Sequence, residues 1–126
     1  MLGGRGEIME KFKFEKLEVY QKTLKFIDKI YSITKKFPKE EMFSLTDQLK
    51  RAALSILTNI AEGCGRYYKK DLSQFIRIAR SSAFECVGLL QVAYNQKYIS
   101  NFEYLQLYKD LQEISKMLNG LMKSLI

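Results

Sequence analysis

The sequence lacks histidine and tryptophan entirely, and among its 126 residues it has one proline and two cysteines. Histidine performs much of the acid–base catalysis near neutral pH, so its absence disfavours an enzyme. The Glu-x-x-His pairs of di-iron bundles are excluded for the same reason. The acids Glu62 and Glu85 have no second carboxylate at a spacing that would form a catalytic pair. We therefore expect no catalytic residue, cofactor, metal or small-molecule substrate, and a function in binding.

Cysteine is too scarce for a disulfide framework. Cys64 and Cys86 show no Cys-x-x-Cys spacing, so we expect both thiols to be reduced. Cys64 stands between Gly63 and Gly65, and a nearby Arg66 would favour a reactive thiolate. No base or orienting group accompanies it, so we prefer the interpretation of a small residue accepted in a tight turn.

Long apolar runs are also missing. No stretch approaches the roughly 20 residues of a membrane span, and the N-terminus has no apolar segment of the secretory type. We expect a cytoplasmic protein that does not contact a membrane.

Proline and glycine are rare in the body of the chain, which disfavours an all-β fold. Three of the seven glycines lie in the first six residues, and Pro38 is the only proline. We expect residues 1–9 to be a disordered tail, with Met9 as a hypothetical native start. Residues 10–126 have the length of one domain.

Apolar residues recur at steps of three and four over four segments, the spacing of one helix face. The segments are 14–36, 44–62, 71–98 and 100–126, and Ser44 with Asp47, Asp71 with Gln74, and Ser100 with Glu103 are candidate caps. Their predicted core residues are Leu17, Tyr20, Leu24, Ile27, Tyr31 and Thr34; Leu45, Leu49, Ala52, Ala53, Ile56 and Ile60; Leu72, Phe75, Ile76, Ala79, Ala83, Cys86, Leu90 and Ala93; and Leu107, Leu111, Ile114, Leu118, Leu121 and Leu125. Short connections imply an all-α, up-down-up-down antiparallel four-helix bundle.

The first helix has a second apolar stripe, formed by Val19, Phe26, Ile30 and Ile33. The third helix carries Phe84 and Gly88 opposite its core stripe. Clustered apolar residues outside a core favour a subunit contact, so we predict that these six residues form a homo-oligomer interface. The alternative is a first helix that lies deep in a monomeric core.

Positive charge is concentrated in two parts of the chain. Residues 1–36 and residues 65–82 each carry a net charge of +4. The rest of the chain carries −1, which gives +7 for the whole. Such clusters favour an anionic partner, RNA or DNA, although a solvated basic face without a partner explains the charge nearly as well. The candidate nucleic-acid-binding residues are Lys22, Lys25, Lys29, Lys50, Arg51, Arg66, Lys69, Lys70, Arg77 and Arg80.

Five parts of the sequence carry a family resemblance. They are Phe14 to Lys22 (FEKLEVYQK), Thr34 to Pro38 (TKKFP), Gln48 to Ile56 (QLKRAALSI), Thr58 to Arg66 (TNIAEGCGR) and Lys116 to Leu121 (KMLNGL). The chain resembles the four-helix-bundle proteins encoded in intervening sequences of bacterial 23S ribosomal RNA genes. Two segments depart from the family pattern: Leu57-Thr58 replaces Pro-Ser, and Cys86-Val87-Gly88 replaces a more polar stretch.

The resemblance implies a ring-shaped homopentamer with a basic surface that binds nucleic acid. The same family includes the accessory variability determinant of diversity-generating retroelements, so it also implies a reverse transcriptase as a partner of some members. The alternative function is a protein-interaction scaffold that docks an acidic partner. We interpret Asn59, Glu62, Gly63 and Gly65 as residues that define the turn between the second and third helices, with bonds from Asn59 and Glu62 to backbone amides or Arg66.

Overall fold

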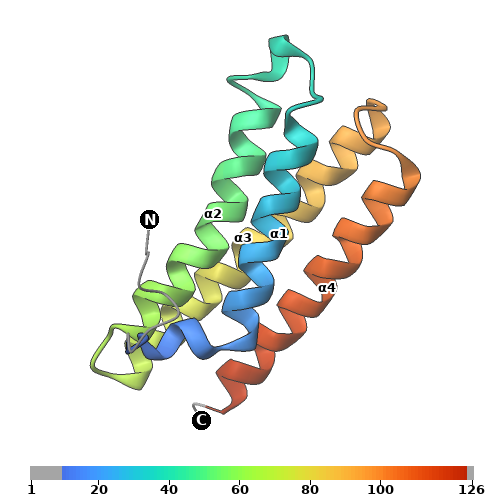
Figure 1. Cartoon of the computed structure of the whole chain (residues 1–126). Coiled ribbons are helices and arrows are strands. Elements are labelled where there is room, and N and C mark those ends of the chain that lie inside the picture. The colour runs from blue at the N-terminus through green and yellow to red at the C-terminus, as the bar shows by residue number, and fades with distance from the viewer. Residues whose placement is uncertain (1–9, 125–126) are drawn as a thin grey trace.

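The computed structural model describes residues 10–124, which form four α-helices joined by short connections. The helices are α1 (Glu18–Thr34), α2 (Leu45–Cys64), α3 (Lys69–Asn95) and α4 (Asn101–Lys123), with short 3-10 helices η2 (Lys13–Lys16) and η3 (Lys39–Glu41). The α1–α2 and α3–α4 connections lie at one end of the molecule, and the α2–α3 turn lies at the other (Figure 1). The predicted up-down-up-down four-helix bundle is therefore confirmed. The predictions for residues 1–9 and Leu125 lie outside the described residues.

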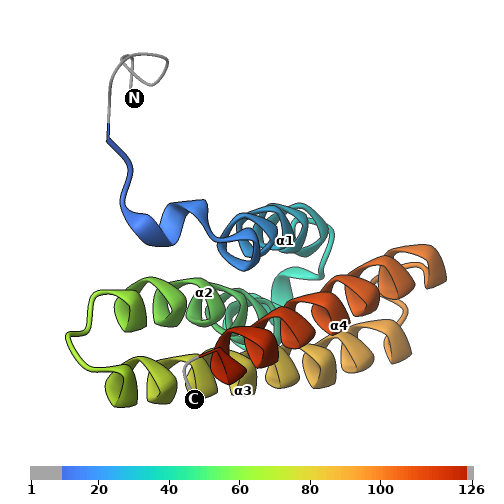
Figure 2. The ribbon, with the colours of Figure 1, turned by 90° about the horizontal axis from the view of Figure 1, so that it is seen from below.

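Each helix packs against two neighbours, in the order α1, α2, α3, α4 and back to α1 (Figure 2). The contact between α2 and α3 is the most extensive. Alanines at positions 52, 53, 79, 83 and 93 of these two helices are buried, and such small side chains let helices approach closely. The predicted core stripe of α2 is buried throughout, and that of α3 is buried except for the half-buried Leu72 and Phe75.

The predicted core face of α1 is correct in part. Ile27 and Thr34 are buried as predicted, and Leu17 and Tyr20 are half-buried against the core. Leu24 and Tyr31, also predicted as core, are 37% and 38% exposed, whereas Phe26 is 1% and Ile30 0% exposed. The four α1 residues predicted as a subunit interface, Val19, Phe26, Ile30 and Ile33, are all buried in the protomer's own core. They are not available for a contact between subunits.

Two threonines of α1 are buried beside this apolar stripe. Thr23 and Thr34 are buried with this stripe because their hydroxyls donate to the backbone oxygens of Val19 and Ile30, at 2.7 and 2.8 Å. Back-bonding of this kind removes most of the cost of burying a hydroxyl. The sequence of α1 contains two apolar stripes, and packing against α2 and α4 determines which of their residues are buried.

Helix ends agree with prediction in part. Ser100 and Glu103 form the predicted capping box of α4, with reciprocal bonds of 3.0 and 2.9 Å. Ser44 precedes α2 as predicted, but its hydroxyl donates to Glu41 rather than capping the helix. Asp71 does not cap α3, which begins earlier, at Lys69.

The third helix ends at Asn95, short of the predicted Tyr98. Lys97 adopts a left-handed backbone conformation with φ of 65°. The Tyr98 and Lys97 amides then donate to the carbonyls of Ala93 and Tyr94, both at 2.9 Å. This is a Schellman motif in which lysine occupies the position that glycine prefers, so no glycine marks this helix end in the sequence.

None of the helices in residues 10–124 is long and apolar enough to cross a membrane.

Candidate nucleic-acid interface

A row of ion pairs joins α1 to α4. Lys22, Lys29 and Lys36 are seven residues apart, so they fall on one side of α1. Lys22 lies 2.6 Å from Glu113, Lys29 lies 2.7 Å from Asp110, and Lys36 pairs with Glu103. The Lys22 ammonium holds the pKa of Glu113 below its ordinary value, and Lys36 does the same for the pKa of Glu103. The hydrogen bond to Glu113 raises the pKa of Lys22.

This row removes Lys22 and Lys29 from the set of free cations that the sequence suggested. Asp110 is buried and accepts from Lys29, with Lys22 3.5 Å away. The side of the helix that carries these two lysines faces acids of α4, so both are paired within the protomer rather than free to contact phosphates.

Two arginines of the candidate set are also paired within the protomer. Arg51 lies 2.9 Å from Asp47, and Arg66 lies 3.0 Å from Glu62, one helical turn away in each case. The pairing of Glu62 with Arg66 was predicted. Lys50 is half-buried and its ammonium lies 4.8 Å from the ring centre of Tyr31.

The remaining candidates are exposed cations. Lys25, Lys69, Lys70 and Arg77 have no acidic partner within salt-bridge distance among residues 10–124. Lys69 and Lys70 begin α3, and Arg77 is seven residues after Lys70, on the same side of the helix. Among the candidate residues, three of the exposed cations without an acidic partner thus lie on the first turns of α3.

Two tyrosines beside these lysines were missed by the sequence prediction. Tyr67 is 93% and Tyr68 66% exposed, and their rings meet edge to face with centroids 5.4 Å apart. The signal was present as aromatic residues between basic ones, Arg66-Tyr67-Tyr68-Lys69-Lys70 directly after a glycine. We name Tyr67, Tyr68, Lys69 and Lys70 the aromatic–basic turn.

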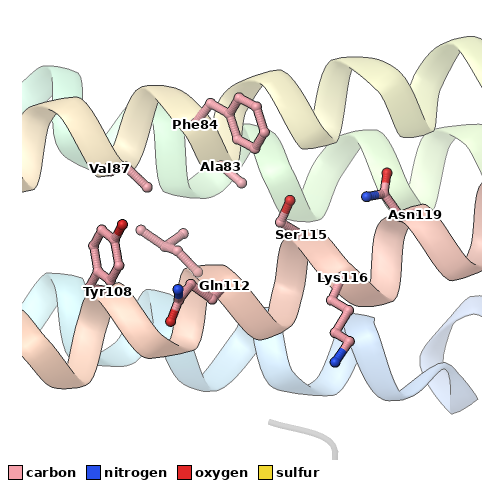
Figure 3. Close-up of a pocket in the computed structure, with 9 residues that line it drawn as sticks. Ala83, Phe84, Val87, Tyr108, Gln112, Ser115, Lys116 and Asn119 are labelled. Atoms are coloured by element: carbon pink, nitrogen blue, oxygen red, sulfur yellow. The ribbon is translucent and has the colours of Figure 1, made fainter.

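A groove of about 550 Å³ runs between α3 and α4 (Figure 3). It is lined by Phe84 and Val87 of α3 and by Tyr108 and Lys116 of α4, and Val87 and Tyr108 point toward each other (Figure 3). The Arg80 guanidinium lies 4.6 Å from the ring centre of Phe84. Its Nε is buried and has no hydrogen-bond acceptor in the described chain. Arg80 is therefore half-buried, unlike the exposed candidates Lys69, Lys70 and Arg77.

The two predicted interface residues on α3 do lie on the surface. Phe84 is 52% exposed, and a Cβ added at Gly88 would meet no atom within 4 Å. Both are accessible to a partner. Their role in assembly stays a prediction.

The turn from α2 to α3 depends on Gly63 for space rather than for unusual dihedral angles. A Cβ at Gly63 would lie 2.9 Å from the Cβ of Phe75, and no described glycine has a positive φ. Gly65 has φ of −83°, which any residue adopts. Asn59 does not bond across the turn; its amide donates to the backbone oxygen of Ser55 at 2.8 Å.

The cysteines show no sign of an activated thiol. Burial raises the pKa of the Cys64 thiol, and burial with the nearby Glu85 charge raises that of Cys86 to about 12. Arg66 is directed to Glu62 and to the Phe75 ring, 4.6 Å from its centre. Within residues 10–124 no cluster of three or more cysteines and acids could hold a metal ion.

Comparison with known proteins gives the family. The sequence model of the 23S rRNA-intervening sequence protein family matches residues 15–120. A crystal structure of a protein of unknown function from the S23 ribosomal protein family of Bacteroides thetaiotaomicron is similar, with a TM-score of 0.77 and 28% identity. The similarity covers 83% of this chain and 95% of that one. No protein with a curated functional description matches. The chain belongs to the family of 23S rRNA-intervening sequence proteins.

Proposed function

We propose that the protein is a non-catalytic, homo-oligomeric accessory protein that binds the phosphates of RNA or DNA. The observation that carries this proposal is the group of exposed, unpaired cations on the first turns of α3, Lys69, Lys70 and Arg77. Residues 65–82 carry a net charge of +4, and the one acid among them is Asp71. An uncompensated cluster of this kind attracts a polyanion.

The proposed binding is largely independent of sequence. Lysine and arginine contacts to phosphates position a nucleic acid but do not read its bases. Each phosphate neutralised releases counterions, so affinity falls steeply as salt rises. Lys25 on α1 is a further exposed cation available for such a contact.

Gel-shift titrations over a salt series test the proposal. Charge reversal in the Lys70→Glu, Arg77→Glu double variant should weaken binding to RNA and DNA at least tenfold and reduce the salt dependence by about two phosphate contacts. The matched control is Lys35→Glu with Lys39→Glu, two exposed lysines near the α1–α2 connection at the opposite end, with the same change in net charge. The control should bind far better than the α3 variant.

Equal loss in both variants would mean that only net charge matters and that α3 is not the contact surface. Absence of binding by the unmodified protein at low salt would exclude the function. A scaffold that docks an acidic partner or a reverse transcriptase would then be the remaining candidate.

We further propose that copies of the chain assemble through the outer side of α3 near Phe84 and Gly88. Phe84 is half-exposed, and a Cβ added at Gly88 would meet no atom within 4 Å. The glycine leaves space in which another helix could pack against the Phe84 ring. The family resemblance favours a pentamer. Light scattering on Phe84→Asp should give a smaller mass than the unmodified protein, with an unchanged helical spectrum, because Phe84 lies outside the core. An unmodified protein that scatters as a monomer would refute assembly.

A further inference from the structure

The aromatic–basic turn is unusual because it exposes two tyrosine rings together. Tyr67 and Tyr68 are 93% and 66% exposed, although the transfer of an aromatic ring out of water lowers the free energy. The rings are nearly perpendicular, at 85°, so each has a face or edge open to solvent. Within residues 10–124 the aromatic partner of each ring is the other ring, so no core contact of the described residues explains their placement.

Unpaired positive charge adjoins the rings. Lys69 and Lys70 follow directly and have no ion-pair partner among residues 10–124, while Arg66 on the other side is held by Glu62. A groove or surface that combines aromatic rings with cations is the usual arrangement for single-stranded nucleic acid, in which bases stack on rings and phosphates contact the cations.

The N-terminal segment lies at the same end of the bundle as the aromatic–basic turn. Helix η2 contacts α2, and both views show it near the α2–α3 turn (Figures 1 and 2). Phe12 is 71% exposed and stacks on Phe14 with centroids 5.7 Å apart, between the exposed Lys11 and Lys13. A second pair of aromatic residues among lysines therefore lies at the same end of the bundle.

The combination of exposed rings and unpaired lysines indicates which kind of partner could cover this end of the bundle. An apolar protein surface would cover the rings but would bury uncompensated lysines, which costs free energy. A duplex would satisfy the lysines but offers no free base faces to the rings, because its bases are already stacked. A single strand supplies both groups at once.

We propose that the aromatic–basic turn is a stacking site for unpaired bases, so that the protein prefers single-stranded RNA or DNA to duplex. This inference rests on the proposed nucleic-acid function and names its ligand class and its location. Tyr67 and Tyr68 contact bases, and Lys69 and Lys70 contact the phosphates between them.

Fluorescence anisotropy with labelled oligouridine, oligodeoxythymidine and a duplex, the strands about 12 nucleotides long, tests the inference. The Tyr67→Ala, Tyr68→Ala double variant should lose about tenfold or more in affinity for either single strand, and little for the duplex. Its salt dependence should stay unchanged, because no charge is removed. Tyr67→Phe with Tyr68→Phe should bind as the unmodified protein does, since stacking needs the ring and not the hydroxyl.

Phe43→Ala is the matched control, because Phe43 is 91% exposed near the α1–α2 connection at the opposite end. It should leave all three affinities unchanged. In the Lys69→Gln, Lys70→Gln variant the salt slope should fall by about 1.4, the value for two contacts to a single strand. Comparison of the RNA and DNA arms shows whether the sugar contributes.

The outcomes separate the two proposals. If the tyrosine variant binds single strands normally while the lysine variant is weakened, stacking is refuted and phosphate binding stands. If the tyrosine variant loses as much affinity for the duplex as for the single strands, the rings support the phosphate-binding surface or the fold rather than stack on bases. The inference is then also refuted. If the unmodified protein binds none of the three probes, both proposals fail.

Discussion

Lys29 of α1 donates a hydrogen bond of 2.7 Å to Asp110 of α4, and Asp110 is the one charged residue buried within residues 10–124. Its carboxylate lies on the row of ion pairs that includes Lys22 with Glu113 and Lys36 with Glu103. Because α1 and α4 are antiparallel, lysines along one helix meet acids in reverse order along the other. The contact between the two helices is thus partly ionic, unlike the alanine-rich contact between α2 and α3.

Replacing Asp110 with asparagine should lower the free energy of unfolding by about 1–3 kcal/mol, because a buried carboxylate that holds two lysines becomes a neutral amide. Urea unfolding gives the measurement. The control is Asp47→Asn, which breaks the exposed pair with Arg51 and should cost less than about 0.5 kcal/mol. Equal small effects in both variants would show that the α1–α4 row contributes nothing to stability.

Phe26→Ala should destabilise the protomer by about 3–5 kcal/mol, because Phe26 is 1% exposed and its removal leaves a cavity. Leu24→Ala, at a position 37% exposed, should cost well under half as much. Thermal or urea unfolding of the two variants tests the rotational position of α1. The reverse order of the two losses would mean that the stripe of Leu24 and Tyr31 faces the core.

Acid should weaken the bundle partly through Glu103 and Glu113, whose pKa values are lowered by Lys36 and Lys22. A carboxyl with a lowered folded-state pKa contributes stability above its ordinary pKa of 4.5, and loses it as pH falls through the folded value. Urea midpoints should therefore fall between about pH 5 and about pH 3. Glu113→Gln should make this fall shallower, whereas Glu85→Gln, at an exposed residue without an ion pair, should not.

Gly63→Ala should destabilise the protein, because the new Cβ would lie 2.9 Å from the Phe75 Cβ and 3.0 Å from the Leu72 Cδ1. Gly88→Ala has open space and should stabilise the protomer by up to about 1 kcal/mol through higher helix propensity. Circular dichroism melts of the two variants supply the comparison. A stable Gly63→Ala protein would show that α2 and α3 separate readily at this point.

Cys86 should resist a thiol reagent in the folded protein at neutral pH, because burial holds its pKa near 12 and shields the sulfur. Cys64 is half-buried with a raised pKa and should react faster than Cys86 but more slowly than an exposed thiol. The absorbance of the group that the reagent releases on reaction gives both rates. The Cys64→Ala variant shows which rate belongs to which cysteine. Rapid reaction of Cys64 in the folded protein would indicate the activated thiol considered from the sequence.

The sequence by itself determined the number of helices, their order and the core faces of α2, α3 and α4. In these three helices a single stripe is continuously apolar, so only one orientation buries it, and Leu49, Ile76 and Ile114 are all 0% exposed. The capping box of Ser100 and Glu103 was readable for a similar reason, because both of its partners lie within one turn of the chain. Local chemistry and a single apolar face suffice for such features.

The tertiary structure alone decided which face of α1 is buried and which of its lysines remain free. Two apolar stripes on one helix are equivalent until neighbouring helices supply partners, and Lys29 appeared to be a free cation until Asp110, far along the chain, came within 2.7 Å. The run of tyrosines among basic residues is visible in the sequence, but the exposure of Tyr67 and Tyr68 emerged only from the fold, because a sequence does not reveal whether a core is within reach of a ring. Pairing and exposure depend on contacts between distant segments, and periodicity along one helix carries no information about them.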